Sequence, residues 1–147
     1  MKIIESIKST REIGRKAEAI AEIWFIRNGY RICHKNWIKN HREIDLIVEN
    51  QKFRVFVEVK FNGATSMNFP ESKVNKFKQQ FLRICARDYQ NEFPSNKTIR
   101  FDVIAITQSA FSTQIFHVKD AFYGLRSYKS SYRLSHFYDI DFNVKRF

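Results

Sequence analysis

The chain has 147 residues, 44% of them hydrophobic, which is enough for one domain with a sizeable core and excludes a disordered chain. Lys and Arg number 26 against 15 Asp and Glu, so the formal net charge is +11. That charge favours a polyanionic partner, either nucleic acid or an acidic membrane surface, and leaves a generically basic cytosolic protein as the alternative.

The first predicted element is a helix over residues 11–28. Ser9 and Glu12 have the spacing of a capping box at its start, and Gly29 stands where a helix is expected to stop. Apolar residues recur at helical spacing and predict the buried face of this helix: Ile13, Ala17, Ile20, Trp24 and Phe25.

Three strands are predicted next, over residues 30–34, 43–49 and 53–60, and Asn50 and Gln51 form a two-residue turn between the second and the third. The strands are short and rich in β-branched and aromatic residues. Because the turn is so short, we expect these last two strands to pair as an antiparallel hairpin.

A second helix is predicted over residues 71–90, after a loop over residues 61–70, with Ser72 as its candidate cap. One side of this helix carries the apolar residues that we expect in the core: Val74, Phe77, Phe81 and Cys85.

Two more strands are predicted over residues 99–107 and 114–118, and a period-two pattern predicts a late strand over residues 138–145. The resulting order indicates an α/β fold in a single domain, with a central mixed β-sheet flanked by helices. We expect this domain to span residues 1–122. Residues 123–147 are aromatic, basic and serine-rich, and we expect them to form an extension that packs on the domain.

The sequence favours a cytoplasmic protein. No apolar run approaches the roughly 20 residues of a membrane span, and the first ten residues lack the apolar stretch of a secretion signal. Cys33 and Cys85 lie far apart and are expected to be reduced core thiols, with a disulfide as the alternative. The histidines are scattered without ligand spacing, so no zinc site is expected.

Three charged residues interrupt the two apolar strands in the middle of the chain. Asp45 lies in one strand, and Glu58 and Lys60 lie in the next. Such charges are costly in a half-buried sheet unless they pair or bind something. With the predicted turn, Asp45 opposes Phe56 and becomes a same-face diagonal neighbour of Glu58, roughly 7–8 Å away between Cβ atoms.

Two carboxylates at that separation can converge on one cation. Mg²⁺ prefers oxygen ligands and keeps several waters, so Asp45 and Glu58 would hold it for attack on a phosphodiester. Lys60 would orient the attacking water or neutralise charge that develops on the phosphate. The alternative is an ordinary ion pair of Lys60 with Glu58 or Glu43 on a solvated face.

Glu18 lies at the margin of the apolar stripe of the first helix, beside Ala21 and Phe25, and not on the far solvent face. Gly14, one turn earlier, permits close approach of another backbone. A surface glutamate paired with Arg15 is the alternative reading of this position.

A set of short motifs occurs in order from Gly14 to Phe122. It comprises Gly14-x-x-Ala17-Glu18, Gly29-Tyr30, Asn36, Glu43-Ile44-Asp45-Leu46-Ile47, Phe56-Val57-Glu58-Val59-Lys60, Lys76, Arg100-Phe101-Asp102-Val103 and Ala121-Phe122. Through this ordered set the chain resembles the YraN-type family of uncharacterised bacterial proteins, which belongs to the restriction-endonuclease-like PD-(D/E)xK nuclease superfamily.

The resemblance implies a restriction-endonuclease-like fold with an α-β-β-β-α-β core. It also implies a site similar to that of archaeal Holliday-junction resolvases, in which the backbone carbonyl of Val59 is a further metal ligand. The site residues carried over are Glu18, Asp45, Glu58 and Lys60. The chain departs from the wider pattern at three positions. It has Arg42 in place of the usual glycine, Ile44 in place of proline and Asn62 in place of arginine.

Basic residues supply the predicted contacts to nucleic acid. Lys39 and Arg42 form one cluster, within which Trp37 would either stack on an unpaired base or pack against the sheet. The second helix carries a stripe that can contact backbone phosphates, for which a solvated helix face is the alternative. The stripe consists of Lys76, Arg83 and Arg87.

These features predict a metal-dependent endonuclease, with Mg²⁺ or Mn²⁺ as cofactor, that hydrolyses phosphodiester bonds in structured or branched DNA. One rival is a non-catalytic nucleic-acid-binding accessory protein with a nuclease-like fold. A second is a structural partner in an assembly, which uses residues 123–147 as its interface. Four-way junctions have two-fold symmetry, so a homodimer would suit such a substrate.

Overall fold

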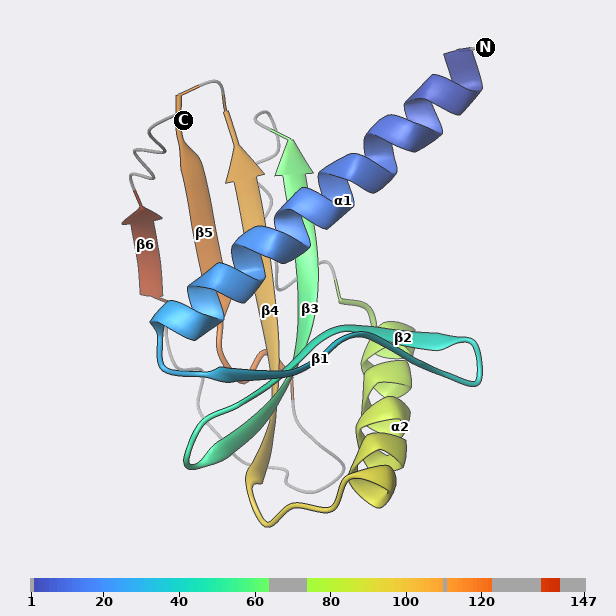
Figure 1. The fold of residues 1–147 in the computed structure, drawn as a ribbon, viewed down its shortest axis with the longest axis vertical. Helices are drawn as coiled ribbons and strands as arrows, with labels where there is room; N and C mark the ends of the chain where they lie inside the picture. The colour runs from blue at the N-terminus through green and yellow to red at the C-terminus, as the bar shows by residue number, and fades with distance from the viewer. Residues whose placement is uncertain (1, 64–73, 110, 123–135, 141–147) are drawn as a thin grey trace.

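The computed structural model describes residues 2–63, 74–109, 111–122 and 136–140. Within them, six strands form one sheet in the order β1-β2-β3-β4-β5-β6, with helices α1 and α2 packed on its two faces (Figure 1). Strands β3 and β4 are parallel, and the other neighbouring strands are antiparallel. The predicted α/β fold with a mixed sheet is confirmed, and the arrangement is compatible with a restriction-endonuclease-like fold.

Helix α1 (Lys2–Arg27) ends in a Schellman motif, in which the chain turns through a left-handed glycine. Gly29 has φ +81°, and its N–H donates to the carbonyl of Ile26 at 3.1 Å. The next N–H, that of Tyr30, donates to the carbonyl of Phe25 at 3.0 Å, and the two rings pack edge to face. The predicted helix stop at Gly29 is therefore confirmed.

The predicted start of this helix was wrong. Ser9 and Glu12 lie inside α1, which begins at Lys2 and crosses the sheet obliquely over β3 and β4 (Figure 1). No glycine or proline precedes Gly14, so nothing in the local sequence interrupts the helix, and the capping-box spacing falls within it.

Strands β1 (Arg31–Lys39) and β2 (Arg42–Glu49) form a hairpin. The last residue of β1 pairs with the first residue of β2. The two turn residues, Asn40 and His41, both have left-handed backbone, with φ 50° and 62°. That combination is typical of a type I′ turn, which suits the twist of a two-residue hairpin. The prediction that the first strand ends at residue 34 was wrong, because pairing continues to the turn.

Strand β3 (Phe53–Gly63) follows a loop closed by a side chain. The Oδ1 atom of Asn50 accepts hydrogen bonds from the N–H groups of Lys52 and Phe53, at 2.9 and 2.7 Å. This side chain stabilises a longer loop than the predicted two-residue turn, in the way that asparagine often organises turns.

The longer loop changes the pairing of β2 with β3 by two residues. Glu49 faces Arg54, not Lys52 as predicted. A shift of two residues leaves every side chain on its predicted face of the sheet. The paired residues end at Leu46 opposite Val57, and one further step in the same register would bring Asp45 opposite Glu58 and not diagonal to it.

Helix α2 (Lys76–Glu92) begins after its N-cap, Asn75. The Asn75 side chain accepts a hydrogen bond from the N–H of Lys78 at 2.9 Å, which satisfies one of the donors left free at a helix start. The predicted start at residue 71 was therefore too early, and the predicted cap, Ser72, lies outside the described residues.

The buried face of α2 differs from the predicted one. The residues that pack on the sheet are Leu82, Cys85, Ala86 and Tyr89. Phe77 and Phe81 were predicted in the core, but they are 79% and 46% exposed. At about 100° per residue, they lie roughly 90° or more around the helix from the centre of the buried stripe.

Strands β4 (Thr98–Gln108) and β5 (Thr113–Val118) confirm the predictions over residues 99–107 and 114–118. The described part of the tail is β6 (His136–Ile140), which pairs with β5 and overlaps the predicted late strand. The rest of that strand and the remainder of the predicted extension lie outside the described residues.

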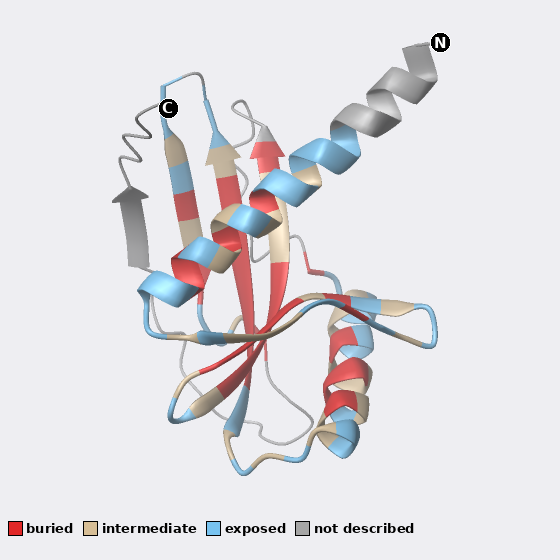
Figure 2. Cartoon of the chain, viewed as in Figure 1, coloured by how far each residue is buried: buried red, intermediate tan, exposed pale blue. Residues whose placement is uncertain are grey.

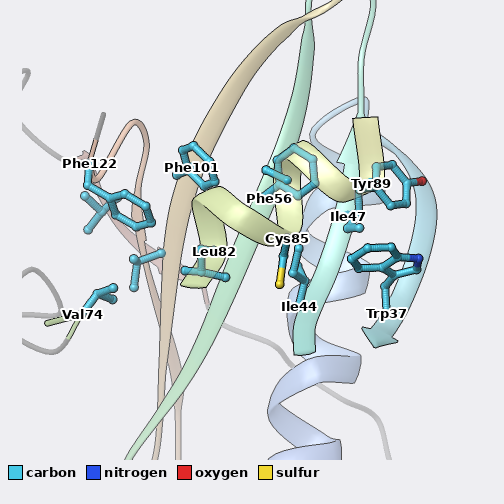
Figure 3. Close-up of a cluster of buried hydrophobic side chains, with 13 residues drawn as sticks. Trp37, Ile44, Ile47, Phe56, Val74, Leu82, Cys85, Tyr89, Phe101 and Phe122 are labelled. Atoms are coloured by element: carbon cyan, nitrogen blue, oxygen red, sulfur yellow. The ribbon is translucent and has the colours of Figure 1, made fainter. Parts of the chain in front are cut away.

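Each face of the sheet carries its own hydrophobic core, and the buried residues follow the helices and central strands in Figure 2. Figure 3 shows the core beneath α2, where Tyr89 packs among Trp37, Phe56 and Ile47. Both cysteines are free. No helix in the described part of the chain is long and apolar enough to cross a bilayer.

A buried polar network fixes α1 to the sheet. Trp24 Nε1–H donates to His117 Nδ1 at 3.1 Å, so the ring proton of His117 lies on Nε2, which donates to Asp102 at 2.8 Å. Arg100 adds two hydrogen bonds to the same carboxylate, each 2.7 Å long. Burial works against ionisation of Asp102, but these donors outweigh it and lower its pKa.

Removing this carboxylate should loosen α1. We expect Asp102→Ala to reduce the free energy of unfolding by about 3 kcal/mol, because it leaves Arg100 and His117 buried without their partner. Chemical denaturation at pH 7 measures the change. Asp120→Asn is the matched control, because the Asp120 carboxylate is exposed, asparagine tolerates the left-handed backbone there (φ 55°), and the backbone N–H still donates to Asp102. Equal stability of the two variants would contradict the prediction.

Candidate functional site

The candidate site lies where β2 separates from β3. Regular pairing runs as far as Leu46 opposite Val57. Beyond that point the N–H of Val59 donates to the Oδ2 atom of Asp45 at 2.8 Å. The Asp45 side chain thus takes a hydrogen bond from the neighbouring strand and is held beside it.

Glu58 lies next to this separation and is only 3% exposed. Two amines neutralise it from different elements. Lys60 Nζ, from the same strand, lies 2.7 Å from Oε1, and Lys78 Nζ, from α2, lies 3.0 Å from Oε2. The second contact is an ion pair, and Oε2 accepts no other hydrogen bond among the described residues.

The charges around Asp45 change its affinity for a proton. Burial, and then the negative charge of Glu58, raise the pKa of Asp45 to about 7. The hydrogen bond from Val59 and the charge of Lys78 act in the opposite direction but do not compensate. A cation between Asp45 and Glu58 would relieve this repulsion.

Glu18 approaches the site from α1, on the other side of the hairpin. Its Oε2 atom accepts a hydrogen bond from Asn36 at 3.1 Å, and its charge contributes to the raised pKa of Asp45. The described residues contain no group of three or more His, Cys, Asp or Glu side chains placed to hold one metal ion. Glu18 therefore lies beside the pair of carboxylates and outside any common set of ligands.

Lys78 was missed by the reasoning from sequence. It lies one turn before Leu82, on the side of α2 that faces the sheet. If the buried residues of α2 had been predicted correctly, helical periodicity would have placed Lys78 on the side of the helix that faces Glu58. Burial works against the charged form of Lys78, but the carboxylate of Glu58 outweighs it and raises the pKa of the amine.

An ordinary ion pair on a solvated face was the alternative for Glu58 and Lys60. The ion pair exists, but Glu58 is buried, and a buried carboxylate with two lysines differs from a surface pair in its energetics. Lys60 and Lys78 remain 30% and 35% exposed at their side chains, so both amines are accessible from solvent.

The predicted nucleic-acid contacts differ in their surroundings. Lys39 forms an ion pair with Glu92 at 3.0 Å. Arg42 lies over the ring of Phe81, 5.5 Å from its centroid. The three residues of the helix stripe have different exposures: Lys76 and Arg87 are exposed, and Arg83 is half-buried.

Trp37 is not available to stack on a base. It is 9% exposed and packs edge-on against Tyr89, with ring centroids 5.2 Å apart. Of the two roles left open for Trp37, the structure therefore selects packing against the sheet. Two aromatic side chains of α2, Phe77 and Phe81, do reach solvent.

Comparisons with known proteins agree on one family. The model of the uncharacterised protein family UPF0102 matches residues 17–106. A UPF0102 protein of Thermodesulfovibrio yellowstonii is 35% identical over 76% of this chain and 96% of its own length. Those of Bacteroides thetaiotaomicron and Chlorobium chlorochromatii are 33% and 35% identical, over 76% and 78% of this chain and 93% and 94% of their own lengths.

The raised pKa of Asp45 predicts a pH-dependent stability in metal-free buffer. The folded protein binds this proton more tightly than the unfolded chain does. The resulting stabilisation is complete below about pH 4 and is lost as the pH rises toward 7. Asp45→Asn cannot ionise and can still accept the hydrogen bond from Val59. We expect it to match wild type near pH 4 and to be more stable by about 4 kcal/mol at pH 8, since each pKa unit corresponds to about 1.4 kcal/mol.

Denaturant unfolding with EDTA at the two pH values measures this difference. Glu43→Gln is the matched control, because Glu43 lies in the same strand with an exposed side chain. If Asp45→Asn is no more stable than wild type at pH 8, ionisation of Asp45 does not reduce the free energy of unfolding, and the prediction is wrong.

Proposed function

The chain belongs to the uncharacterised protein family UPF0102, and we propose that it is a metal-dependent endonuclease that hydrolyses phosphodiester bonds in structured or branched DNA. The observation that carries this proposal is that the negative charges of Asp45 and Glu58 act on each other where β2 separates from β3, with two partly exposed amines beside Glu58. Carboxylates and amines in one half-buried site are the groups that such a hydrolysis uses.

The donors present fit a divalent metal. Asp45 and Glu58 offer oxygen atoms, which Mg²⁺ and Mn²⁺ prefer, and the buried Oε2 of Glu58 has Lys78 as its one partner among the described residues. The carbonyl of Val59 is the further ligand that the family resemblance implies. When bound, the metal would supply a coordinated water of lowered pKa and would stabilise negative charge on the scissile phosphate.

The lysines would divide the remaining work. Lys60 would orient the attacking water or neutralise charge on the phosphate; its amine is partly exposed and lies 2.7 Å from Glu58, which supports this role. Lys78 holds Glu58 from the other side of the site and reduces the cost of burying it. Glu18, held by Asn36, would complete the wall of the site and position water there.

DNA fits the charge of the chain better than a neutral substrate does, because +11 favours a polyanion. Lys39, Arg42, Lys76, Arg83 and Arg87 would contact the phosphates on either side of the cleaved bond. A homodimer would present two such sites to a two-fold symmetric junction. A cytoplasmic location would give the enzyme access to this substrate.

A nucleic-acid-binding accessory protein is the second candidate. One observation favours it: both oxygens of Glu58 lie within ion-pair distance of a lysine, so this carboxylate is neutralised without a metal. An accessory protein would bind DNA equally well in EDTA and would not cut it. Metal-dependent cleavage therefore separates the two candidates.

The catalytic test uses duplex, single-stranded, flap and four-way DNA with Mg²⁺ or Mn²⁺. We expect wild type to cut at least one structured substrate. Asp45→Asn and Glu58→Gln should abolish cleavage, and Lys60→Ala should reduce it by about 100-fold or more, since one electrostatic donor commonly contributes that much. Binding in EDTA should change little in Lys60→Ala, because this residue is one of 26 basic side chains.

Lys52→Ala is the matched control for this test, because Lys52 is an exposed lysine in the loop before β3. It should cut like wild type. Unchanged cleavage by Lys60→Ala would assign the activity to another group or to a contaminant. Absence of cleavage on every substrate with both metals would select the accessory protein.

Metal binding should also be visible without DNA. Mg²⁺ at about 100 times its Kd should increase the free energy of unfolding by about 2.7 kcal/mol, since only the folded protein presents the site. We expect Glu58→Gln to lose this increase and Glu43→Gln to keep it. Thermal unfolding across a Mg²⁺ titration measures it, and an equal shift in all three proteins would exclude a site at Glu58.

A further inference from the structure

Two phenylalanines on α2 face solvent and form what we term the aromatic platform, Phe77 and Phe81. They are 79% and 46% exposed. Together with Gln80 and Ile84 they line an open hollow of about 240 Å³. Two large rings on one exposed helix face are costly to leave in water, so this surface is a candidate for contact with a partner.

The helix that carries the platform is rich in positive charge. The residues of α2 from its start to Arg87 include four basic side chains and no acidic one, and Asp88 is the first carboxylate. Arg42, from β2, lies over the Phe81 ring, and its buried Nε has no hydrogen-bond partner among the described residues. Aromatic rings interleaved with cations are the arrangement on which unpaired bases stack while their phosphates are neutralised.

The platform adjoins the candidate site. Phe77 precedes Lys78 in the chain, and Lys78 reaches Glu58 at 3.0 Å. Phe81 lies three residues further along, about 60° around the helix from Lys78. A strand whose phosphate lies at Glu58 and Lys78 would therefore pass the platform within a few nucleotides.

We propose that the aromatic platform stacks unpaired bases of the nucleic acid, next to the position where its phosphodiester is bound. The location of the bound phosphate rests on the proposed function; the stacking itself does not. Charge selects this occupant over a second copy of the chain, because two copies of one basic face repel each other. The amide of Gln80 can hydrogen-bond the edge of a stacked base, which acyl chains cannot do.

The test measures binding in EDTA, where no cleavage occurs, by fluorescence anisotropy. Three labelled probes of equal length are compared: single-stranded oligothymidylate, its abasic analogue and a blunt duplex. Phe77→Ala with Phe81→Ala should weaken binding of the single strand by about 10-fold or more, since stacking contributes roughly 1–3 kcal/mol per base. Binding of the abasic strand and the duplex should stay within about two-fold of wild type, because phosphate contacts remain.

Phe111→Ala is the matched control, because Phe111 is 99% exposed and lies outside α2. It should bind all three probes like wild type. Lys76→Gln should weaken all three probes alike, since it removes a phosphate contact. As a second readout, Phe77→Trp should retain affinity, and its fluorescence should be quenched by the single strand and not by the abasic strand.

Equal loss on all three probes, or no loss on the single strand, would overturn the proposal. Anionic vesicles that bind wild type but not the double variant, with single-strand binding unchanged, would assign the platform to a membrane surface and would also overturn it. The outcome is separable from that of the proposed function. If the platform stacks bases but no substrate is cut, the stacking proposal stands and the nuclease proposal fails. If DNA is cut but binding does not depend on bases, the nuclease proposal stands and the stacking proposal fails.

Discussion

The burial of Glu58 is the constraint on which the rest of the site depends. A carboxylate that is 3% exposed must be neutralised, and the chain does this with one amine from the same strand and another from α2. The contact with Lys78 orients the first turn of α2 over the strands. This contact lies on the same side of α2 as its buried residues, which leaves Phe77 and Phe81 on the side that meets solvent.

Asp102 is a second buried carboxylate, and its hydrogen bonds are those of a group with a purely structural role. Asp102 accepts hydrogen bonds at both oxygens from Arg100, His117 and the N–H of Asp120, and these donors lower its pKa. It faces α1, whereas Glu58 faces α2. Asp45, by contrast, has a raised pKa, and one oxygen of Glu58 lacks a directed hydrogen bond. This difference in hydrogen bonding, more than the presence of charge, supports the proposal that Asp45 and Glu58 bind a metal.

The two proposals describe one continuous surface. The carboxylates and amines lie at the separation of β2 and β3, and the aromatic platform begins one residue before Lys78. An enzyme for structured DNA must distinguish unpaired from paired segments near the bond it cuts. Phosphate contacts cannot make that distinction, because the backbone is similar in both, whereas stacking requires a base that is free of its partner.

Local sequence determined the helix stop at Gly29, the positions of the main strands and the shared face of Asp45, Glu58 and Lys60. These depend on interactions over a few residues: a left-handed glycine, β-branched runs and the two-residue alternation of a strand. The alternation is robust, so the face was predicted correctly although the register was wrong by two. The side chain of Asn50 closes the loop that accompanies this register, and a sequence pattern does not reveal which hydrogen bonds such a side chain will make.

Only the tertiary structure decided the orientation of α2, the role of Lys78 and the exposure of the platform. Helix α2 has apolar residues on more than one side, so its periodicity permits several buried stripes. The stripe that is buried is the one that fills the space over the sheet and also brings a lysine to Glu58. That choice depends on contacts between segments far apart in the chain, such as Lys78 with Glu58 and Tyr89 with Trp37, and no local pattern encodes them.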